Sequence, residues 1–206
     1  MIEVLDIDSD ALKDNPLGDP SKRKLHVIVP DGHEKDSLPC LWYLAGYAGV
    51  GRNQLTRDPW QEGLEERLVR LFKERKIGPM LVALPDGFTR WGGAQYLDSA
   101  ALGNYATYLQ EDLRKAVENR FDGTTHGIAG KSSGGFGAVV HAMRRPDIYS
   151  AVACHSGDMG FELSMFGDLP MLMNAVRDYG SVTDLDNAFR QAVKKKSAKW
   201  FGPMSM

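Results

Sequence analysis

Uninterrupted apolar runs alternate with amphipathic stretches along most of this chain. The runs at 41–44, 80–84 and 151–154 contain no charged residue and end at small, proline or polar residues. Such runs are typical of strands buried on both faces of a sheet. Between them, apolar residues recur at helical spacing in 60–72 and 105–121, which predicts amphipathic helices. The alternation predicts an α/β domain with a mostly parallel sheet and helices on both faces.

The two ends of the chain follow different patterns. Residues 24–29 alternate between apolar and polar side chains, which predicts a strand near a sheet edge. Beyond residue 160 the strand–helix alternation stops, and a Met- and Leu-rich helix is predicted at 169–176. We therefore expect an α/β core over 1–160 and a helical, lid-like segment over 161–206. Packing of that helix into a core is an equal alternative to a lid.

Composition adds few constraints. The chain has 206 residues and a formal net charge of −2, which gives no basic surface for nucleic acid. Its two cysteines, Cys40 and Cys154, exclude a disulfide scaffold, and both are expected as buried, reduced thiols. No apolar stretch is long enough to span a bilayer, and no secretory leader is visible, so a cytoplasmic protein without a membrane partner is expected.

One motif carries most of the chemistry. Residues 130–134 read Gly-Lys-Ser-Ser-Gly and fit the G-x-S-x-G nucleophile elbow. This elbow is a sharp strand-to-helix turn that lifts the hydroxyl of its central serine, here Ser132, above the sheet. A predicted strand precedes the motif at 127–129 and a predicted helix follows it from Gly134, which is the context that the motif requires.

Two other interpretations of the same residues are weaker. Gly130-Lys131-Ser132 could end a phosphate-binding loop of the form G-x-x-x-x-G-K-[ST], but Thr125 stands where that loop needs its first glycine. A glycine-rich junction without chemistry is the other alternative. Both are disfavoured because the matches on either side of the motif point to one family.

The chain resembles the esterase branch of the α/β-hydrolases, which includes S-formylglutathione hydrolases, enterochelin esterases, feruloyl esterases and mycolyltransferase antigens. The resemblance extends from Asn15 to Asp158. It is carried by Asn15-Pro16-Leu17-Gly18-Asp19-Pro20, Pro39 to Gly46, Leu84-Pro85-Asp86-Gly87, Tyr108 to Leu113, Gly130 to Ala138, Arg145-Pro146-Asp147, Tyr149 to Ala153 and Ser156-Gly157. It implies an α/β-hydrolase fold that lacks its last strands in this chain.

The resemblance also implies roles for particular residues. Ser132 corresponds to the nucleophile, and the backbone N–H groups of Ser133 and Tyr47 correspond to the oxyanion donors. Trp91, Gln95, Tyr96 and Asp98 follow the Asp-Gly strand end, where family members line the substrate pocket. For each of them, core packing or a plain surface position is at least an equal alternative.

The acid and base of the triad are harder to assign. Hydrolases of this fold order them as serine, then acid, then histidine, on loops after the last strands. After Ser132 the chain has only His141, expected on a helix away from the site, and His155. His155 is expected to line the pocket. A dyad of His155 with Asp158 reverses the usual order and is disfavoured.

These observations predict a serine hydrolase that cleaves carboxylic esters or thioesters through a Ser132 acyl-enzyme, without metal or organic cofactor. The triad acid and histidine are expected beyond the end of this chain, because the apolar tail at Trp200-Phe201 suggests that structure continues there or is completed by a companion fragment or a homo-oligomer. The alternative is a catalytically incomplete hydrolase scaffold that acts as a binding or interaction module.

Overall fold

The computed structural model describes residues 1–34, 36–56, 59–121 and 125–194. The chain divides into two compact units, Met1–Asp158 and Met159–Met206, which are described separately. The tail at Trp200-Phe201, which suggested that the chain continues, lies outside the described residues.

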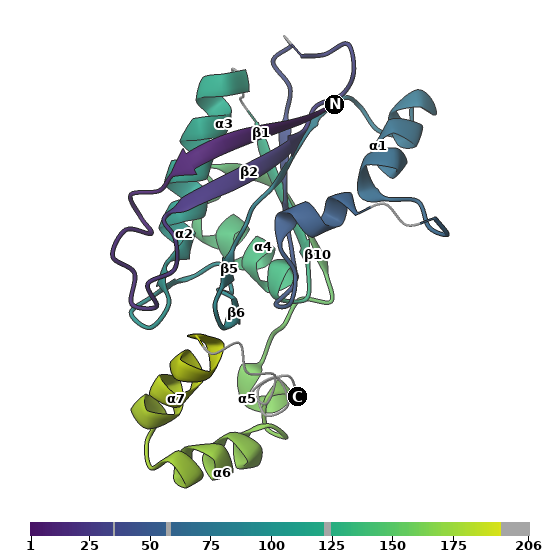
Figure 1. The fold of residues 1–206 in the computed structure, drawn as a ribbon. Helices are drawn as coiled ribbons and strands as arrows, with labels where there is room; N and C mark the ends of the chain where they lie inside the picture. The colour runs from purple at the N-terminus through teal and green to yellow at the C-terminus, as the bar shows by residue number, and fades with distance from the viewer. Residues whose placement is uncertain (35, 57–58, 122–124, 195–206) are drawn as a thin grey trace. The chain divides into compact units, whose positions relative to one another are not determined.

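The first unit is built on one mixed sheet of six strands, in the order β1-β2-β4-β3-β9-β10 (Figure 1). The four strands from β4 to β10 are mutually parallel, whereas β1 and β2 run antiparallel to their neighbours. The mixed sheet, with three parallel and two antiparallel pairings, agrees with the predicted mostly parallel arrangement. The strands are β1 (Ile2–Asp8), β2 (Lys22–Ile28), β3 (Cys40–Leu44), β4 (Leu81–Leu84), β9 (His126–Lys131) and β10 (Tyr149–His155).

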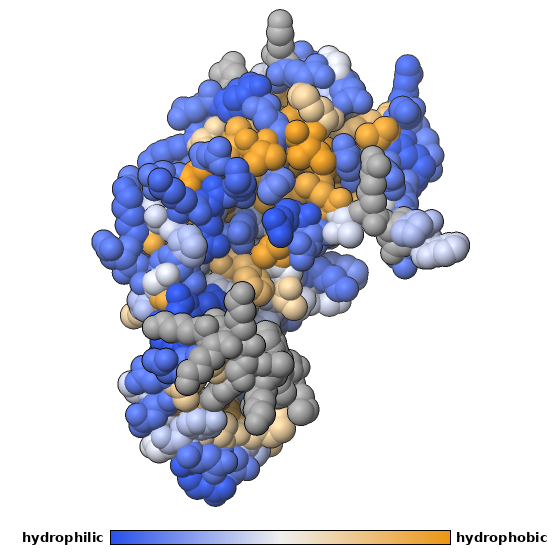
Figure 2. Space-filling view, in the orientation of Figure 1, coloured by the Kyte–Doolittle hydropathy of each residue, from blue (hydrophilic) through white to orange (hydrophobic). Residues whose placement is uncertain are grey.

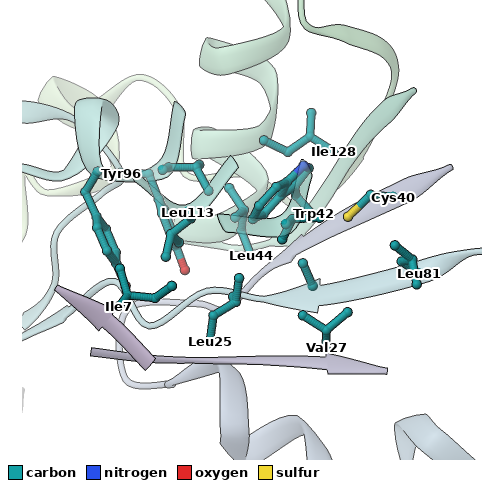
Figure 3. Packing of buried hydrophobic residues seen from close by; sticks show 14 of the residues in the cluster. Ile7, Leu25, Val27, Cys40, Trp42, Leu44, Leu81, Tyr96, Leu113 and Ile128 are labelled. Carbon is teal, nitrogen blue, oxygen red and sulfur yellow. The ribbon is translucent and has the colours of Figure 1, made fainter. Parts of the chain in front are cut away.

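Helices cover both faces of this sheet. Helix α1 (Leu64–Lys73) packs through Leu68 against Val82 and Leu84 on one face. The other face is covered by α4 (Ser133–Arg144) and by a continuous helical stretch made of α2 (Tyr105–Thr107), a π-helical turn η2 (Tyr108–Leu113) and α3 (Arg114–Phe121). Figure 3 shows the core on this second face, where Trp42 and Leu44 of β3 meet Leu113 and Ile128.

The predicted helix at 105–121 is confirmed, because all six residues of its apolar stripe are buried: Tyr105, Tyr108, Leu109, Leu113, Val117 and Phe121. The helix predicted at 60–72 begins later than expected. Trp60 is 90% exposed, and the helix starts after Gly63, whose N–H donates to the Glu66 carboxylate at 3.0 Å. This hydrogen bond satisfies a donor at the helix entrance and fixes its start.

Two short hairpins connect β4 to the helical stretch. Strands β5 (Phe88–Thr89) and β6 (Gly92–Gly93) pair antiparallel, and so do β7 (Asp98–Ser99) and β8 (Gly103–Asn104). The short helix η1 (Gly51–Leu55) follows β3, and a Cβ atom on Gly51 would lie 2.2 Å from the carbonyl oxygen of Leu84. Only glycine therefore lets the segment after β3 pass this close to the end of β4.

The position of β2 refines one prediction. Residues 24–29 were expected near a sheet edge, and β2 is the second strand from it, because β1 pairs with β2 from Ile2↔Ile28 to Asp8↔Lys22 and forms the edge itself. Leu25 and Val27 are completely buried as a result. The alternation of Leu5 and Ile7 with Asp6 and Asp8 is the signal that could have predicted β1.

The exposure of β10 corrects a second prediction. The run at 151–154 was expected to be buried on both faces, but every residue of β10 after Tyr149 is exposed. Within the part of the chain that the structure describes, β10 pairs only with β9 and ends the sheet. Cys154 is consequently an exposed free thiol, whereas Cys40 is buried as expected.

The face of the sheet beside α1 is only partly covered. Figure 2 shows apolar side chains at the surface of the first unit between β2 and α1. Partly buried side chains of the second apolar cluster lie in this region: Leu41, Tyr43, Leu55, Leu64, Phe72, Ile77 and Met80.

The second unit is helical, with α5 (Phe161–Ser164), α6 (Leu169–Tyr179) and α7 (Val182–Lys194). Helix α7 begins at a cap in which Ser181 Oγ accepts the N–H of Asp184 at 3.1 Å. The Met- and Leu-rich side chains of α6 are exposed, from 46% at Leu169 to 70% at Met173. The lid-like role of this segment stays a prediction.

Candidate active site

Ser132 stands at the turn between β9 and α4 in an unusual backbone conformation. Its φ is 55° and its ψ is −127°, a region that non-glycine residues rarely occupy. Strain of this kind persists where the surrounding structure enforces it, and it is concentrated at functional sites. Ser132 precedes the first residue of α4, yet its side chain makes no capping hydrogen bond to the helix. The Ser132 hydroxyl therefore does not cap the helix, which is the usual role of a serine at this position.

The glycines two residues before and after Ser132 are required because backbone segments pack too closely there for a side chain. A Cβ atom on Gly130 would lie 2.3 Å from the carbonyl of Gly134, and one on Gly134 would lie 2.1 Å from the carbonyl oxygen of Leu44. The turn therefore packs against itself and against the end of β3. Since residues 126–131 form β9, they are not a loop wrapped around phosphates, and the phosphate-loop interpretation does not apply.

The segment after β3 lies beside the serine hydroxyl. A Cβ atom on Gly46 would be 3.5 Å from Ser132 Cβ and 3.9 Å from Ser132 Oγ. The N–H groups of Tyr47 and Ser133, the two expected oxyanion donors, have no hydrogen-bond acceptor among the described residues. The Tyr47 carbonyl accepts the N–H of Gly93 at 2.7 Å, and the Tyr47 hydroxyl donates to the carbonyl of Trp91, so the donor segment is held against the β5–β6 hairpin.

A buried hydrogen-bond network also holds the segment after β3. The Tyr96 hydroxyl donates to the Ala45 carbonyl at 2.9 Å, and the Tyr96 carbonyl is 2.8 Å from His141 Nε2. His141 Nδ1 is 2.7 Å from Gln110 Nε2. Burial lowers the pKa of His141, so the imidazole is neutral, with Nε2–H as donor to Tyr96 and Nδ1 as acceptor from Gln110. His141 lies on α4, as predicted, and the structure shows that it is buried, with both ring nitrogens bonded to residues other than Ser132.

Trp91 and Gln95 lie in and after the β5–β6 hairpin. Trp91 is partly buried and touches the donor segment through its carbonyl. Gln95 has a φ of 55°, as does Tyr96, and the Gln95 Oε1 atom is buried without a hydrogen-bond donor among the described residues. Two successive left-handed residues and an unpaired acceptor distinguish this segment from ordinary core packing.

The turn after β10 is hydrogen-bonded to Ser132 on the side of β9 opposite to β3. The Ser132 N–H donates to the His155 carbonyl at 3.1 Å, and the Asp158 N–H donates to the Ser132 carbonyl at 3.3 Å. The Asp158 carboxylate accepts the Ser132 hydroxyl at 3.0 Å and the Ser133 hydroxyl at 2.8 Å. Ser132 thus has Asp158, and not an imidazole, as its side-chain partner.

The expected site residues are therefore brought together in part. Ser132, Ser133 and the Tyr47 segment converge, and His155 reaches the site through its carbonyl, while its ring is exposed and bonds to no described residue. The disfavoured His155–Asp158 dyad is not formed, because Asp158 binds the two serines directly. Tyr96 was expected only as a possible pocket residue, and its hydrogen bonds to Ala45 and His141 had no signal in the sequence.

The match to a known family agrees with this geometry. Residues 20–200 match the family described as "Putative esterase". The chain belongs to this esterase family.

The chain is also similar to individual curated proteins. The chain is 28% identical to the S-formylglutathione hydrolase of Paracoccus denitrificans over 136 residues, which are 62% of this chain and 49% of that protein. The chain thus spans about half the length of this curated relative.

Solved structures show the α/β-hydrolase fold of esterases. A ferulic acid esterase superposes with a TM-score of 0.65 at 20% identity, over 76% of this chain and 60% of its own. Fluorophosphonate-binding serine hydrolase F of Staphylococcus aureus gives 0.61 at 19% identity, over 80% and 60%. The S-formylglutathione hydrolase of Agrobacterium tumefaciens gives 0.57 at 21% identity, over 74% and 57%.

The described part of the chain contains neither a membrane-spanning helix nor a metal-binding cluster. No helix there has the length and apolarity to cross a bilayer. No group of three or more His, Cys, Asp or Glu side chains among those residues is arranged to hold a metal ion.

Proposed function

We propose that this protein is a serine hydrolase that cleaves carboxylic esters or thioesters, with Ser132 as the nucleophile. The observation that carries the proposal is the strained conformation of Ser132 between β9 and α4, with Gly46 beside its hydroxyl. Membership of the esterase family supports the same reaction class.

In this mechanism the Ser132 oxygen attacks the carbonyl carbon of the ester. The developing oxyanion accepts hydrogen bonds from the N–H groups of Tyr47 and Ser133, which have no acceptor among the described residues. The positive end of the α4 dipole favours the same negative charge. The alcohol or thiol leaves with a proton, an acyl group stays on Ser132, and water then releases the acid.

The serine proton requires a base. Of the described side chains, only Asp158 is hydrogen-bonded to Ser132 Oγ, and a serine without an imidazole base is a poor nucleophile. We assign the triad histidine and acid to residues outside the described chain. The predicted companion fragment or homo-oligomer and the predicted cytoplasmic location stay predictions.

The pocket residues proposed for substrate contact are Trp91, Gln95 and His155. Gln95 is the strongest of the three, because its buried Oε1 could accept a hydrogen bond from a substrate. The named relatives include an S-formylglutathione hydrolase and ferulic acid esterases, so thioesters and aryl esters are the first substrates to test.

The test is an intact-mass spectrum of the purified protein before and after a fluorophosphonate probe, combined with hydrolysis of p-nitrophenyl acetate. In a preparation that includes the residues supplying the triad histidine, we expect one adduct on Ser132 and turnover of the ester, and we expect Ser132→Ala to lose both while its circular dichroism spectrum is unchanged. Ser133→Ala is the matched control, because its N–H remains and only its hydroxyl is lost.

Two results would overturn the proposal. Turnover retained in Ser132→Ala would remove the nucleophile assignment. A wild-type protein with neither adduct nor turnover would instead favour the alternative of a hydrolase scaffold that serves as a binding module.

A further inference from the structure

Asp158 holds a position at Ser132 that the proposed mechanism does not use. Its carboxylate oxygens accept the Ser132 and Ser133 hydroxyls at 3.0 and 2.8 Å, and its N–H donates to the Ser132 carbonyl at 3.3 Å. A Cβ atom on Gly157 would lie 2.9 Å from the backbone of Gly135 at the start of α4. The turn that carries Asp158 is therefore packed against the turn that carries the nucleophile, and the carboxylate is fixed in place.

The charge of Asp158 has no counter-ion in the described structure. No ion pair among the described residues includes Asp158. The side chain of Lys131, at the end of β9, is exposed and takes part in no ion pair among the described residues. Two hydroxyls and the N-terminal end of α4 stabilise the anion, but no described residue compensates its net charge.

An uncompensated carboxylate beside the attacking oxygen acts on any charge that the substrate brings. An ester carbonyl that is bonded to Ser132 Oγ places its acyl and alcohol parts within a few bonds of Asp158. At such separations a like charge is repelled and an opposite charge is attracted, more strongly in a partly buried site than in water. The effect applies to the transition state as well, so it alters kcat/KM and not binding alone.

We propose that Asp158 is a specificity-determining residue that selects cationic esters and rejects anionic ones. The inference rests on the proposed function, because it requires that Ser132 reacts with esters. It goes further by naming the charge class of the substrate.

The experiment uses two matched substrate sets and measures kcat/KM. The first set places the charge in the acyl part, as p-nitrophenyl esters of γ-trimethylammoniobutyrate, of its neutral carbon isostere and of the glutarate monoanion. The second places it in the alcohol part, as acetate esters of choline, of its carbon isostere and of hydroxypropionate. The readout is the ratio of the cationic to the anionic substrate within each set.

In at least one set we expect the wild-type ratio to exceed that of Asp158→Asn by about tenfold or more, as expected for a fixed charge near the reacting atoms. Asp158→Asn keeps the size of the side chain and removes its charge. Asp158→Ser is the second variant if the first does not fold. Asp8→Asn is the matched control, because it removes the same charge from an exposed position on β1, the opposite edge of the sheet.

The outcomes separate the two proposals. Hydrolysis of the neutral esters with a ratio that Asp158→Asn leaves unchanged in both sets overturns this inference alone. A wild-type protein that cleaves anionic esters as well as cationic ones in both sets also overturns it, whether or not the variants fold. Failure of all six esters together with failure of fluorophosphonate labelling overturns the proposed function, and this inference with it.

Discussion

Strands β3 and β10 flank β9 on opposite sides and run parallel to it, but they differ sharply in burial. Cys40, Trp42 and Leu44 of β3 are at most 1% exposed, whereas β10 is exposed from Ser150 to His155. Each strand continues into a segment that touches Ser132. The buried strand leads to Gly46 and to the proposed oxyanion donor at Tyr47, and the exposed strand leads to the Asp158 carboxylate.

The difference indicates a division of tasks at this site. In the proposed mechanism the oxyanion donors must be held in place before the reaction, and a segment anchored by a buried strand and by Tyr96 would meet that need. Asp158 is instead held by hydrogen bonds to the elbow itself and by close packing at Gly157. Four predictions test the contrast between the two strands.

The largest expected effect is in thiol reactivity, because each strand carries one cysteine. Cys154 of β10 is exposed, whereas burial raises the pKa of Cys40 in β3 to about 12. In native protein at pH 8 we expect Cys154 to react with Ellman's reagent about a thousandfold faster than Cys40. Cys154→Ser should remove the fast phase, and a fast phase that persists in this variant would contradict the assigned burial.

The second effect is the loss of stability when the elbow is pushed away from β3. In Gly134→Ala the new Cβ atom would meet the Leu44 carbonyl oxygen at 2.1 Å. We expect the free energy of unfolding in urea to fall by about 3 kcal/mol. Gly78→Ala is the control, because a Cβ atom there has nothing within 4 Å, and equal losses in the two variants would refute the close contact.

The third effect concerns the hydrogen bond that anchors the donor segment. Tyr96→Phe leaves the Ala45 carbonyl without its donor, which should lower the free energy of unfolding by about 1 kcal/mol. If the protein is the proposed hydrolase, kcat should fall more than KM changes, because a mispositioned donor weakens transition-state binding. Tyr43→Phe on β3 is the matched control, because the Tyr43 hydroxyl has no hydrogen-bond partner among the described residues.

The smallest expected effect is on the pH dependence of the free energy of unfolding, and it comes from His141, which is bonded to Tyr96. Because burial lowers the pKa of His141, the unfolded chain binds more protons than the folded chain below pH of about 6.5. Stability should therefore decrease as the pH falls from about 6.5 toward the folded pKa. Urea titrations at several pH values should show a shallower slope for His141→Gln than for His33→Gln, and His26, whose pKa burial also lowers, should supply the remainder.

Much of the fold could be predicted from the chain because local patterns determined it. Strands β3 and β4, the helical stretch from 105 to 121 and the elbow around Ser132 all follow from apolar runs, helical spacing and glycine positions. The elbow is the clearest case, since Gly130 and Gly134 are required by backbone contacts that the motif encodes.

The remaining features depend on which elements become neighbours. Val82 of β4 and Val152 of β10 stand in similar apolar runs, yet Val82 is 1% exposed and Val152 is 51% exposed. No local pattern distinguishes them, because burial depends on the strands and helices that pack alongside. The bond between Asp158 and Ser132 was missed for the same reason, since it joins two turns 26 residues apart.

The free side of β10 has a consequence for how the protein behaves in concentrated solution. Within the described chain, the backbone N–H and C=O groups on that side face no further strand, and the strand from Tyr149 to Cys154 carries no lysine, proline or acidic side chain. Those are the residues with which natural sheets discourage edge-to-edge association. For the 206-residue chain by itself, light scattering should therefore increase with protein concentration, and Val152→Lys should suppress that increase.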